Sequence, residues 1–340
     1  MIIRNEVELE EALSAPSEAD IAAAKEWNGD VLLLGVGGKM GPSLALRAVK
    51  AARLAGVAHQ VIGVSRFTDE RARALLEQGG VNTVSANLLD EADLAALPSA
   101  PNVIYMAARK FGSTGDEGYT WAMNTYLPGR VAERFRASRI VSFSSGNVYP
   151  FVPVTSGGAT EETPTEPVGE YAISALGRER MFTHFSKVNG TPVVLLRLNY
   201  AVEMRYGVLF DIGSKVFARE AVDVTMGNAN VIWQGDANSV CLRSLPCASA
   251  PPLVLNLTGP ETLSVRWVAQ EFGRHFGVKP EFSGEEAPKA LLNNAARCFQ
   301  MFGYPTVTVT ELIEATARWI GSGGRALGKP THFETRDGKF

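Results

Sequence analysis

The sequence has little cysteine and little histidine. Its three cysteines (Cys241, Cys247 and Cys298) are odd in number and form no C-x-x-C pair. This argues against a disulfide framework or a zinc knuckle and fits a reducing cytoplasm. Cys241 and Cys247 are near enough in sequence to meet, although a cysteine is more often a small buried residue. The four histidines are scattered without metal-ligand spacing, so we expect no metal site.

The chain also lacks a strong charge and a long apolar run. Its net charge of −3 gives no sign of a nucleic-acid or anionic-membrane partner. No stretch approaches the roughly 18 apolar residues of a membrane span. The acidic N-terminus has no hydrophobic segment typical of a secretory signal. We therefore expect a cytoplasmic protein of one or two globular domains.

Apolar strand patterns alternate with helical patterns from residue 31 onward. The predicted strands are Val31–Leu34, Gln60–Val64, Val81–Ser85, Asn102–Met106, Arg139–Phe143 and Pro192–Leu196. The predicted helices between them are 42–55, 68–78, 90–97, about 117–137 and 170–188. Such alternation is typical of βαβ units, whose right-handed crossovers build a doubly wound parallel (Rossmann) sheet of the α/β class. Ligands of such sheets bind at the carboxyl ends of the strands.

We divide the chain into three parts. Residues 1–30 are a helical lead-in, and residues 31–200 form a dinucleotide-binding domain with a returning strand near 253–258. Residues 201–340 form a smaller α/β substrate lobe and a polar C-terminal tail, and residues 201–240 show little periodicity. In this lobe we predict helices at Ser264–Phe276, Glu286–Phe299 and Thr310–Ile320.

A glycine cluster follows the first predicted strand. The run from Val31 to Gly41 ends in glycines spaced G-x-x-G-x-x-G, and Pro42 then opens a helix. A buried strand, a glycine turn and a helix N-terminus together form a phosphate cradle, because the backbone comes close to a pyrophosphate and free N–H groups face it. We expect this turn to bind a dinucleotide through Gly35, Gly38, Lys39, Met40 and Gly41.

The ends of the next strands complete the predicted cofactor site. The second strand ends in Ser65 and Arg66, where an acidic residue would bind the ribose of NAD and an arginine accommodates a 2′-phosphate. We therefore favour NADP, with NAD as the alternative and a solvated charge as the simpler interpretation of Arg66. Leu88 follows the third strand, and the small run Met106, Ala107, Ala108 ends the fourth, where a cofactor can approach the backbone.

Later motifs make the chain similar to a known family. They are the glycine turn, Met106-Ala107-Ala108, Asn124, the S-S-x-x-V-Y block from Ser144 to Tyr149, Tyr171 with Ser174, Arg197 with Asn199, Asp236, and Asn256 with Leu257-Thr258-Gly259. From about residue 31 to residue 322 the chain resembles the extended short-chain dehydrogenase/reductase family, of the NAD-dependent epimerase/dehydratase type.

The resemblance implies a role for each matched residue. Tyr171 would be the acid/base that moves a proton on a substrate hydroxyl or carbonyl, close to the cofactor. Ser145 would hold that oxygen, and Asn124 would support the active-site helix. The expected homodimer would form through the helices at about 117–137 and 170–188.

One residue of the family pattern is missing. The family has Tyr-x-x-x-Lys, and Ala175 stands where the lysine belongs. Positions i and i+4 share a helix face, so the lost cation should leave Tyr171 a poorer base near neutral pH. Lys110, after the fourth strand, is our preferred substitute, although it also fits a surface or phosphate-contacting role. Arg178 lies on the same helix face two turns away.

The substrate is expected to be a sugar, sugar acid or nucleotide sugar. Asn147, Asn199 and Arg205 are the predicted substrate-binding residues besides Ser145. Arg205 can bind a carboxylate or phosphate bidentately, or it can pair with Glu203. Two other functions stay open: a cofactor-binding sensor or assembly subunit without redox turnover, which Ala175 favours, and a lyase or isomerase that retains its cofactor.

Overall fold

A seven-stranded parallel sheet organises the protein. The computed structural model describes residues 1–110, 112, 115–329 and 331–339. The strands are β1 (Val31–Leu34), β2 (Val61–Ser65), β3 (Asn82–Ser85), β4 (Asn102–Tyr105), β5 (Arg139–Ser145), β7 (Val193–Leu198) and β12 (Leu253–Leu257). They lie in the order β12-β7-β5-β4-β1-β2-β3 and all neighbours are parallel. The predicted doubly wound α/β sheet is confirmed.

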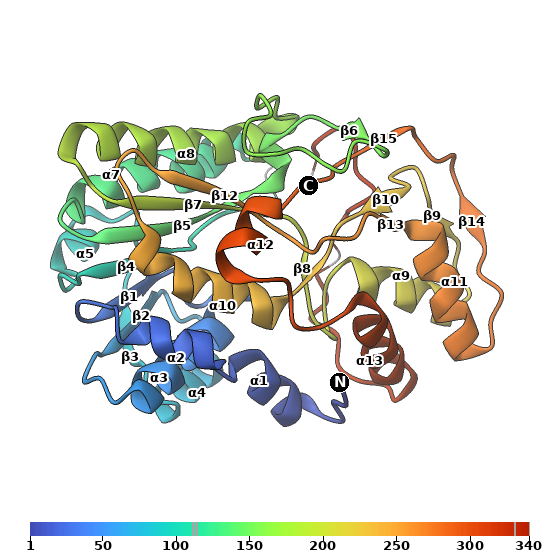
Figure 1. Ribbon diagram of the computed structural model, residues 1–340, viewed down its shortest axis with the longest axis horizontal. Coiled ribbons are helices and arrows are strands. Elements are labelled where there is room, and N and C mark those ends of the chain that lie inside the picture. The colour runs from blue at the N-terminus through green and yellow to red at the C-terminus, as the bar shows by residue number, and fades with distance from the viewer. Residues whose placement is uncertain (111, 113–114, 330, 340) are drawn as a thin grey trace.

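Helices cover both faces of the sheet (Figure 1). Side chains alternate along a strand, so β1 places Val31 and Leu33 in one core and Leu32 and Leu34 in the other. The first core includes residues of α3 (Gly41–Ala55), α4 (Glu70–Gln78) and α10 (Gln234–Ser244). The second includes residues of α5 (Glu91–Ala96), α7 (Leu127–Arg134) and α8 (Gly169–Asn189). Because both faces of the sheet are covered by helices, strands such as β1 are apolar at every position rather than at alternate ones.

The segment predicted as one helix at about 117–137 consists of three consecutive helical pieces. These are α6 (Glu117–Trp121), a π-helical turn η1 (Ala122–Tyr126) and α7. A π-helical turn inserts one extra residue per turn and is frequent at functional sites. Here it carries Asn124, which is completely buried.

The lead-in at residues 1–30 forms two short helices, α1 (Glu6–Ser14) and α2 (Glu18–Ala24). Both lie beside α3 and α10. Asp20 is fully buried and accepts hydrogen bonds from Arg47 of α3 (2.6 and 2.8 Å) and from Ser239 of α10 (2.6 Å). This ion pair ties the lead-in to two helices of the main domain.

The remaining elements build a smaller lobe at one end of the sheet (Figure 1). Its core is formed by α9 (Val208–Phe217), α11 (Val265–Phe276) and α13 (Val309–Gly321). Its short strands are β6 (Val152–Pro153), β8 (Ala201–Val202), β9 (Val222–Asp223), β10 (Asn228–Ala229), β11 (Ile232–Trp233), β13 (Leu263–Ser264), β14 (Phe282–Ser283) and β15 (Lys289–Ala290). The 3₁₀ turns are η2 (Gly146–Val148) and η3 (Leu245–Cys247).

The helix predicted at Glu286–Phe299 is wrong in its first part. Lys289 and Ala290 form β15, which pairs with β6, and the helix α12 runs only from Ala296 to Phe302. Tertiary pairing prevails over local helix propensity here, as is common for marginal segments. No helix in the described ranges is both long and apolar enough to cross a membrane.

Candidate active site

The glycine turn lies between β1 and α3 at the centre of the sheet. Gly35 has φ +94°, and a Cβ there would come within 3.0 Å of the Ala107 backbone at the end of β4. A Cβ at Gly41 would collide with the Val36 carbonyl. Both positions therefore require glycine. Helix α3 begins without a side-chain cap, which leaves backbone N–H groups at its start for an anionic ligand.

A first cavity of about 280 Å³ opens beside this turn. It lies where the order of the strands reverses between β1 and β4, which is the usual ligand position in such sheets. Eight of the residues predicted to bind the cofactor line it: Gly35, Gly38, Ser65, Arg66, Leu88, Met106, Ala107 and Ala108. Arg66 is exposed at its edge. Residues from the ends of four strands (β1, β2, β3 and β4) thus line one cavity, although this proximity does not reveal which ligand binds.

A second cavity of about 290 Å³ lies between the sheet and the smaller lobe. Its lining includes the predicted residues Gly38, Lys39, Met40, Met106, Ala108, Lys110, Ser145, Asn147, Tyr171 and Asn199. Gly38, Met106 and Ala108 line both cavities. The predicted cofactor and reaction residues are therefore continuous along one edge of the sheet.

Ser145 and Tyr171 reach the second cavity from different elements. Ser145 is the last residue of β5, and its hydroxyl donates to Asn147 Oδ1 (2.9 Å) while it accepts from the Asn147 backbone N–H (3.2 Å). Tyr171 is the third residue of α8 and is buried at the cavity wall. A hydroxyl and a phenol that face one cavity can bind one substrate oxygen and exchange a proton with it.

Asn124 connects the segment after β4 to α8. Its side-chain amide donates to the Arg109 carbonyl (2.8 Å) and to Ser174 Oγ (3.0 Å). Its Oδ1 accepts from the Arg109 backbone N–H (2.8 Å) and from Arg178 Nη2 (3.1 Å). These four bonds fix α8 against the end of β4, so Asn124 is placed to support the helix that carries Tyr171.

Ala175 does not face an empty space that a cation could fill. It is fully buried in a small apolar cluster with Val148, Tyr149 and Ala159. Three cations from other positions line the cavity instead: Lys39, Lys110 and Arg178. Lys110 Nζ lies 5.8 Å from the Tyr171 ring centroid and donates to the Thr331 carbonyl (3.4 Å). Burial lowers the pKa of Lys110 to about 8, partly offset by Asp211 and Glu334.

Arg178 is the second cation at this wall. It is only 2% exposed, and its Nη1 donates to the Phe143 carbonyl of β5 (2.7 Å). Its buried Nε has no hydrogen-bond partner among the described residues. A buried donor without a partner is costly and is usually satisfied by water or a ligand.

A network behind α8 holds the helix against the sheet. Glu179 accepts from Ser144 Oγ (2.6 Å) and pairs with Arg197 of β7 through two bonds of 2.9 and 2.7 Å. Arg197 also donates to the Tyr149 hydroxyl (2.6 Å), which donates to Asn256 Oδ1 of β12 (2.9 Å). Charge-assisted bonds of this kind are rigid, so they fix the position of the helix start, where Tyr171 lies.

Lys39 points away from the glycine turn toward the smaller lobe. Its Nζ donates to the Ala201 carbonyl (3.2 Å) and lies 3.7 Å from the Tyr206 ring centroid. Burial lowers the pKa of Lys39 from 10.5 to about 7. We predicted that Lys39 contacts the cofactor; its side chain lines the second cavity and lies against Ala201 and Tyr206 of the smaller lobe.

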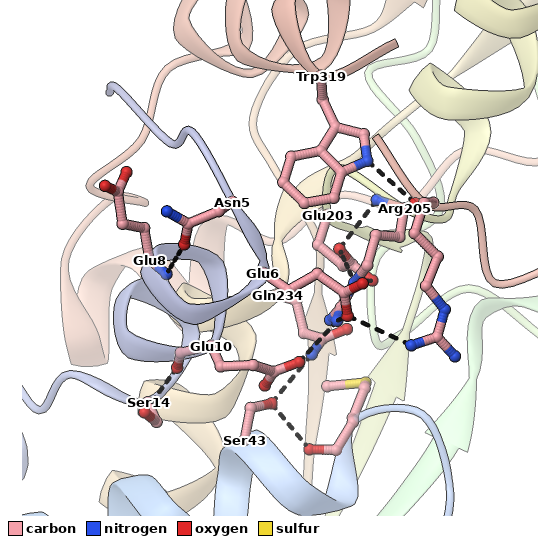
Figure 2. A network of polar contacts seen from close by, with 12 residues as sticks. Asn5, Glu6, Glu8, Glu10, Ser14, Ser43, Glu203, Arg205, Gln234 and Trp319 are labelled. Carbon is pink, nitrogen blue, oxygen red and sulfur yellow. Dashed lines mark hydrogen bonds and ion pairs between the residues drawn. The ribbon is translucent and has the colours of Figure 1, made fainter. Parts of the chain in front are cut away.

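Arg205 is not among the residues that line the second cavity. Its guanidinium pairs with Glu203 (3.2 Å) and with Glu10 (2.7 Å) and Glu6 (3.4 Å) of α1, as Figure 2 shows. Of the two roles left open by the sequence, the structure has the pairing with Glu203. The two partners from the lead-in could not be found from sequence, because they lie far from Arg205 in the chain. We therefore no longer propose Arg205 as a substrate-binding residue.

The substrate side contains residues that sequence reasoning missed. Tyr200 and Thr331 line the cavity, and Thr331 donates to Asp211 of α9 through its backbone N–H (2.8 Å) and its hydroxyl (2.5 Å). Phe333 is buried in the core of the smaller lobe. The C-terminal segment is therefore part of the cavity wall, and the polar composition of this tail gave little sign of it.

Trp233 and Asp236 do not line the second cavity. They line another cavity of about 310 Å³ between the lead-in, α10 and α12. Asp236 accepts three hydrogen bonds from Thr306 and Val307. This carboxylate therefore fixes the connection before α13 rather than a substrate. Within the described residues, no group of three potential metal ligands is close enough to hold an ion.

The fold and the residues of the two cavities are those of a known family of enzymes. Residues 31–202, just over half of the chain, match the NAD dependent epimerase/dehydratase family. The protein belongs to this family, and it is an enzyme of the epimerase/dehydratase type. No curated protein matches its sequence.

Solved structures of similar fold are numerous and distant in sequence. The UDP-glucose 4-epimerase of Thermotoga maritima has a TM-score of 0.71 and 14% identity, over 86% of this chain and 99% of that one. The UDP-glucuronic acid 4-epimerase of Bacillus cereus, solved with NAD, has a TM-score of 0.72 and 17% identity, over 86% and 99%. An epimerase of Methanothermobacter thermautotrophicus has a TM-score of 0.73 and 16% identity, over 90% and 96%. At these identities the likeness establishes the fold alone.

Proposed function

We propose that the protein is an NAD(P)-dependent oxidoreductase or epimerase/dehydratase acting on a carbohydrate-derived substrate. The observation that carries this proposal is that Ser145 and Tyr171 line one cavity, beside the glycine turn of a family that binds nicotinamide dinucleotides. A module that only binds a cofactor has no need of a hydroxyl and a phenol at a shared substrate wall. Two of the solved structures named above are a UDP-glucose 4-epimerase and a UDP-glucuronic acid 4-epimerase, which supports a substrate of this kind.

The chain's residues fit a dinucleotide in two respects. The turn requires glycine at Gly35 and Gly41, and the start of α3 lacks a side-chain cap, so a pyrophosphate can lie against the backbone. In the second cavity the guanidinium of Arg178 adds a positive charge to the wall. When bound, the nicotinamide would supply hydride transfer to or from a substrate carbon.

The first cavity would then hold the adenosine half of the cofactor. Ser65 and Arg66 lie at the end of β2, where the family reads the ribose. Arg66 favours NADP over NAD, because a guanidinium binds a phosphate well. Titration of the purified protein with NADH and NADPH, followed by nicotinamide fluorescence, decides between them, and a clear preference for NADH would contradict this role of Arg66.

Within the second cavity, Tyr171 would move the proton and Ser145 would hold the reacting oxygen. Asn147 keeps the Ser145 hydroxyl oriented through the hydrogen bonds described above. Lys110, near the Tyr171 ring, would supply the positive charge that the residue at Ala175 cannot. Arg178 would hold Asn124 and the Phe143 carbonyl of β5 in place and add a positive charge to the cavity wall.

Replacement of Tyr171 by Phe tests the proposal. Turnover of a substrate found in a panel of sugars, sugar acids and nucleotide sugars should fall by roughly 100-fold or more, because an acid/base group contributes about that much. Binding of the cofactor should stay within about threefold of the wild-type value. Unchanged turnover would refute the role of Tyr171. Tight cofactor binding with no absorbance change for any substrate would instead favour the sensor or assembly subunit.

The proposed homodimer would use the face formed by α6, η1, α7 and α8, which cover the predicted helices at about 117–137 and 170–188. These elements pack together, and Trp121, Tyr126 and Ile173 are exposed on them. Exposed aromatic side chains of this size are typical of protein interfaces. Within the monomer, Trp121 donates to Glu170 through its indole N–H (2.6 Å).

A further inference from the structure

The second cavity is lined by cations and by neutral polar groups. Three cations line it (Lys39, Lys110 and Arg178), and its described lining contains no aspartate or glutamate. The other polar groups there are neutral hydroxyls and amides, chiefly from Ser145, Asn147, Asn199 and the tyrosines. Buried cations are ordinarily paired with carboxylates, and other buried arginines of this chain follow that rule.

Arg47 and Arg197 show the contrast. Arg47 pairs with Asp20 at 2.6 Å, and Arg197 pairs with Glu179 at 2.7 Å. Arg178 is equally buried but has only carbonyl and amide oxygens as described partners, and its Nε has none. The missing negative charge in this cavity is therefore not a general feature of the chain.

Lys39 is the cation on the substrate side. Its described contacts are the Ala201 carbonyl and the Tyr206 ring, both from the smaller lobe. The charged groups that act on it from a distance are Glu203 and Arg205 before α9 and Asp211 on α9. Since Asp211 is bound by Thr331 and Glu203 is bound by Arg205, neither carboxylate neutralises the ammonium by contact.

From these contacts we infer that the substrate carries a carboxylate beside its reacting carbon, as in a sugar acid, and that Lys39 binds this group. This inference rests on the proposed function, since Tyr171 and Ser145 mark the reacting carbon. The cavity of about 290 Å³ must also receive the nicotinamide end of the cofactor, which leaves room for a monosaccharide-sized acid. The neutral hydroxyls and amides of the lining would bind the sugar hydroxyls.

The carboxylate also explains how a partly buried lysine is tolerated. Burial favours the neutral amine, with a pKa of about 7 for Lys39, and an anion that enters the cavity restores the charged form. Binding of a sugar acid should therefore weaken as the pH rises above about 7. Lys110 has a pKa of about 8 and stays charged for about one pH unit more, so it would sustain part of the sugar-acid binding up to about pH 8.

The test uses the full chain with a saturating amount of NADH or NADPH. Glucuronate and glucose, which share a ring and differ in the carboxylate, are titrated calorimetrically at about pH 6.5 and about pH 9. We expect glucuronate to bind roughly 10- to 100-fold more tightly than glucose at the lower pH, because a charge-assisted hydrogen bond contributes about that much. The difference should shrink at the higher pH.

Two substitutions assign the effect to Lys39. Lys39→Met should weaken glucuronate binding by roughly tenfold or more and leave glucose unchanged. Lys39→Arg should retain the binding at about pH 9, because a guanidinium stays protonated there. Lys187→Met, at an exposed position of α8, is the matched control and should leave all affinities unchanged.

Other results would overturn the inference. Equal binding of glucuronate and glucose to the cofactor-loaded protein would do so, as would unchanged glucuronate affinity in Lys39→Met. If Lys39→Met weakens NADH or UDP-glucose and leaves glucuronate unaffected, the lysine serves a diphosphate and the inference is wrong. Failure of NADH and NADPH to bind at all would count against the proposed function, so the two failures are distinguishable.

Discussion

Lys39 makes a prediction about stability that can be tested without a substrate. In the unfolded chain its ammonium is in water, and in the folded chain burial lowers its pKa from 10.5 to about 7. A group whose pKa falls on folding binds its proton more weakly in the native state. The shift therefore lowers the free energy of unfolding at every pH at which Lys39 is charged in the unfolded chain. This loss of stability is largest at and below pH 7, and it disappears as the pH rises toward 10.5.

The size of this penalty follows from the shift. At about 1.4 kcal/mol per pKa unit, a fall from 10.5 to about 7 corresponds to at most roughly 5 kcal/mol at low pH. At about pH 9.5 roughly 1.5 kcal/mol of it remains. Replacement of Lys39 by Met removes the penalty but also the Tyr206 and Ala201 contacts, which together contribute about 1–3 kcal/mol. The variant should be more stable than the wild type near pH 6.5.

Urea unfolding of the wild type and of Lys39→Met, followed by tryptophan fluorescence, measures this effect at about pH 6.5 and about pH 9.5. The stability advantage of the variant should fall by up to about 3 kcal/mol between the lower and the higher pH. Lys187→Met, with an exposed side chain, should show no such pH-dependent difference. An advantage that stays constant or grows with pH would refute the conclusion that Lys39 is buried without a carboxylate.

Three further substitutions test other parts of the structure. Asp20→Asn leaves Arg47 buried without its carboxylate and should lower the free energy of unfolding by about 3–5 kcal/mol in the same urea assay; a loss below about 1 kcal/mol would contradict the buried pair. Gly41→Ala forces a Cβ against the Val36 carbonyl and should weaken NADH binding by roughly tenfold or more. An unchanged dissociation constant for NADH would show that the glycine turn accommodates a Cβ at this position. Tyr126→Lys should shift the protein from dimer to monomer in sedimentation velocity, and an unaltered dimer would place the interface elsewhere.

The main sheet could be predicted from the sequence because its strands are buried on both faces. Val31–Leu34 was predicted with the bounds that the structure has, and the returning strand predicted near 253–258 is β12 (Leu253–Leu257). An apolar run between turn residues has few other interpretations. The glycine turn and its neighbours at the strand ends follow from the sheet, because parallel strands end at one edge.

The smaller lobe was harder to predict for physical reasons. Helix α10 (Gln234–Ser244) is buried almost along its whole length although it contains Gln, Asn and Ser, so it lacks the polar outer face that makes a helix visible in a sequence. Its neighbour α9 (Val208–Phe217) lies in the same weakly periodic stretch and was also missed. At Lys289 and Ala290 the pairing partner β6 is far away in the chain, and local patterns carry no information about it.

In the candidate site, as in the fold, some features could be predicted from the sequence and others could not. The types of residue at its wall could be predicted, and Ser145, Tyr171 and Lys110 do meet at one cavity. The direction of the Lys39 side chain and the partners of Arg205 could not, because both depend on contacts between the lobe, the glycine turn and the lead-in. Long-range contacts of single side chains determine what the cavity binds, and the pattern of a sequence does not record them.

The most direct test of the proposed function is a crystal structure with NADH or NADPH bound. The account predicts the pyrophosphate at the glycine turn, the adenosine beside Arg66, and the nicotinamide ring in the second cavity, in contact with Tyr171 and Ser145. A dinucleotide whose nicotinamide lies outside that cavity, with Tyr171 out of reach, would contradict the central claim that these two residues act on a substrate at the cofactor.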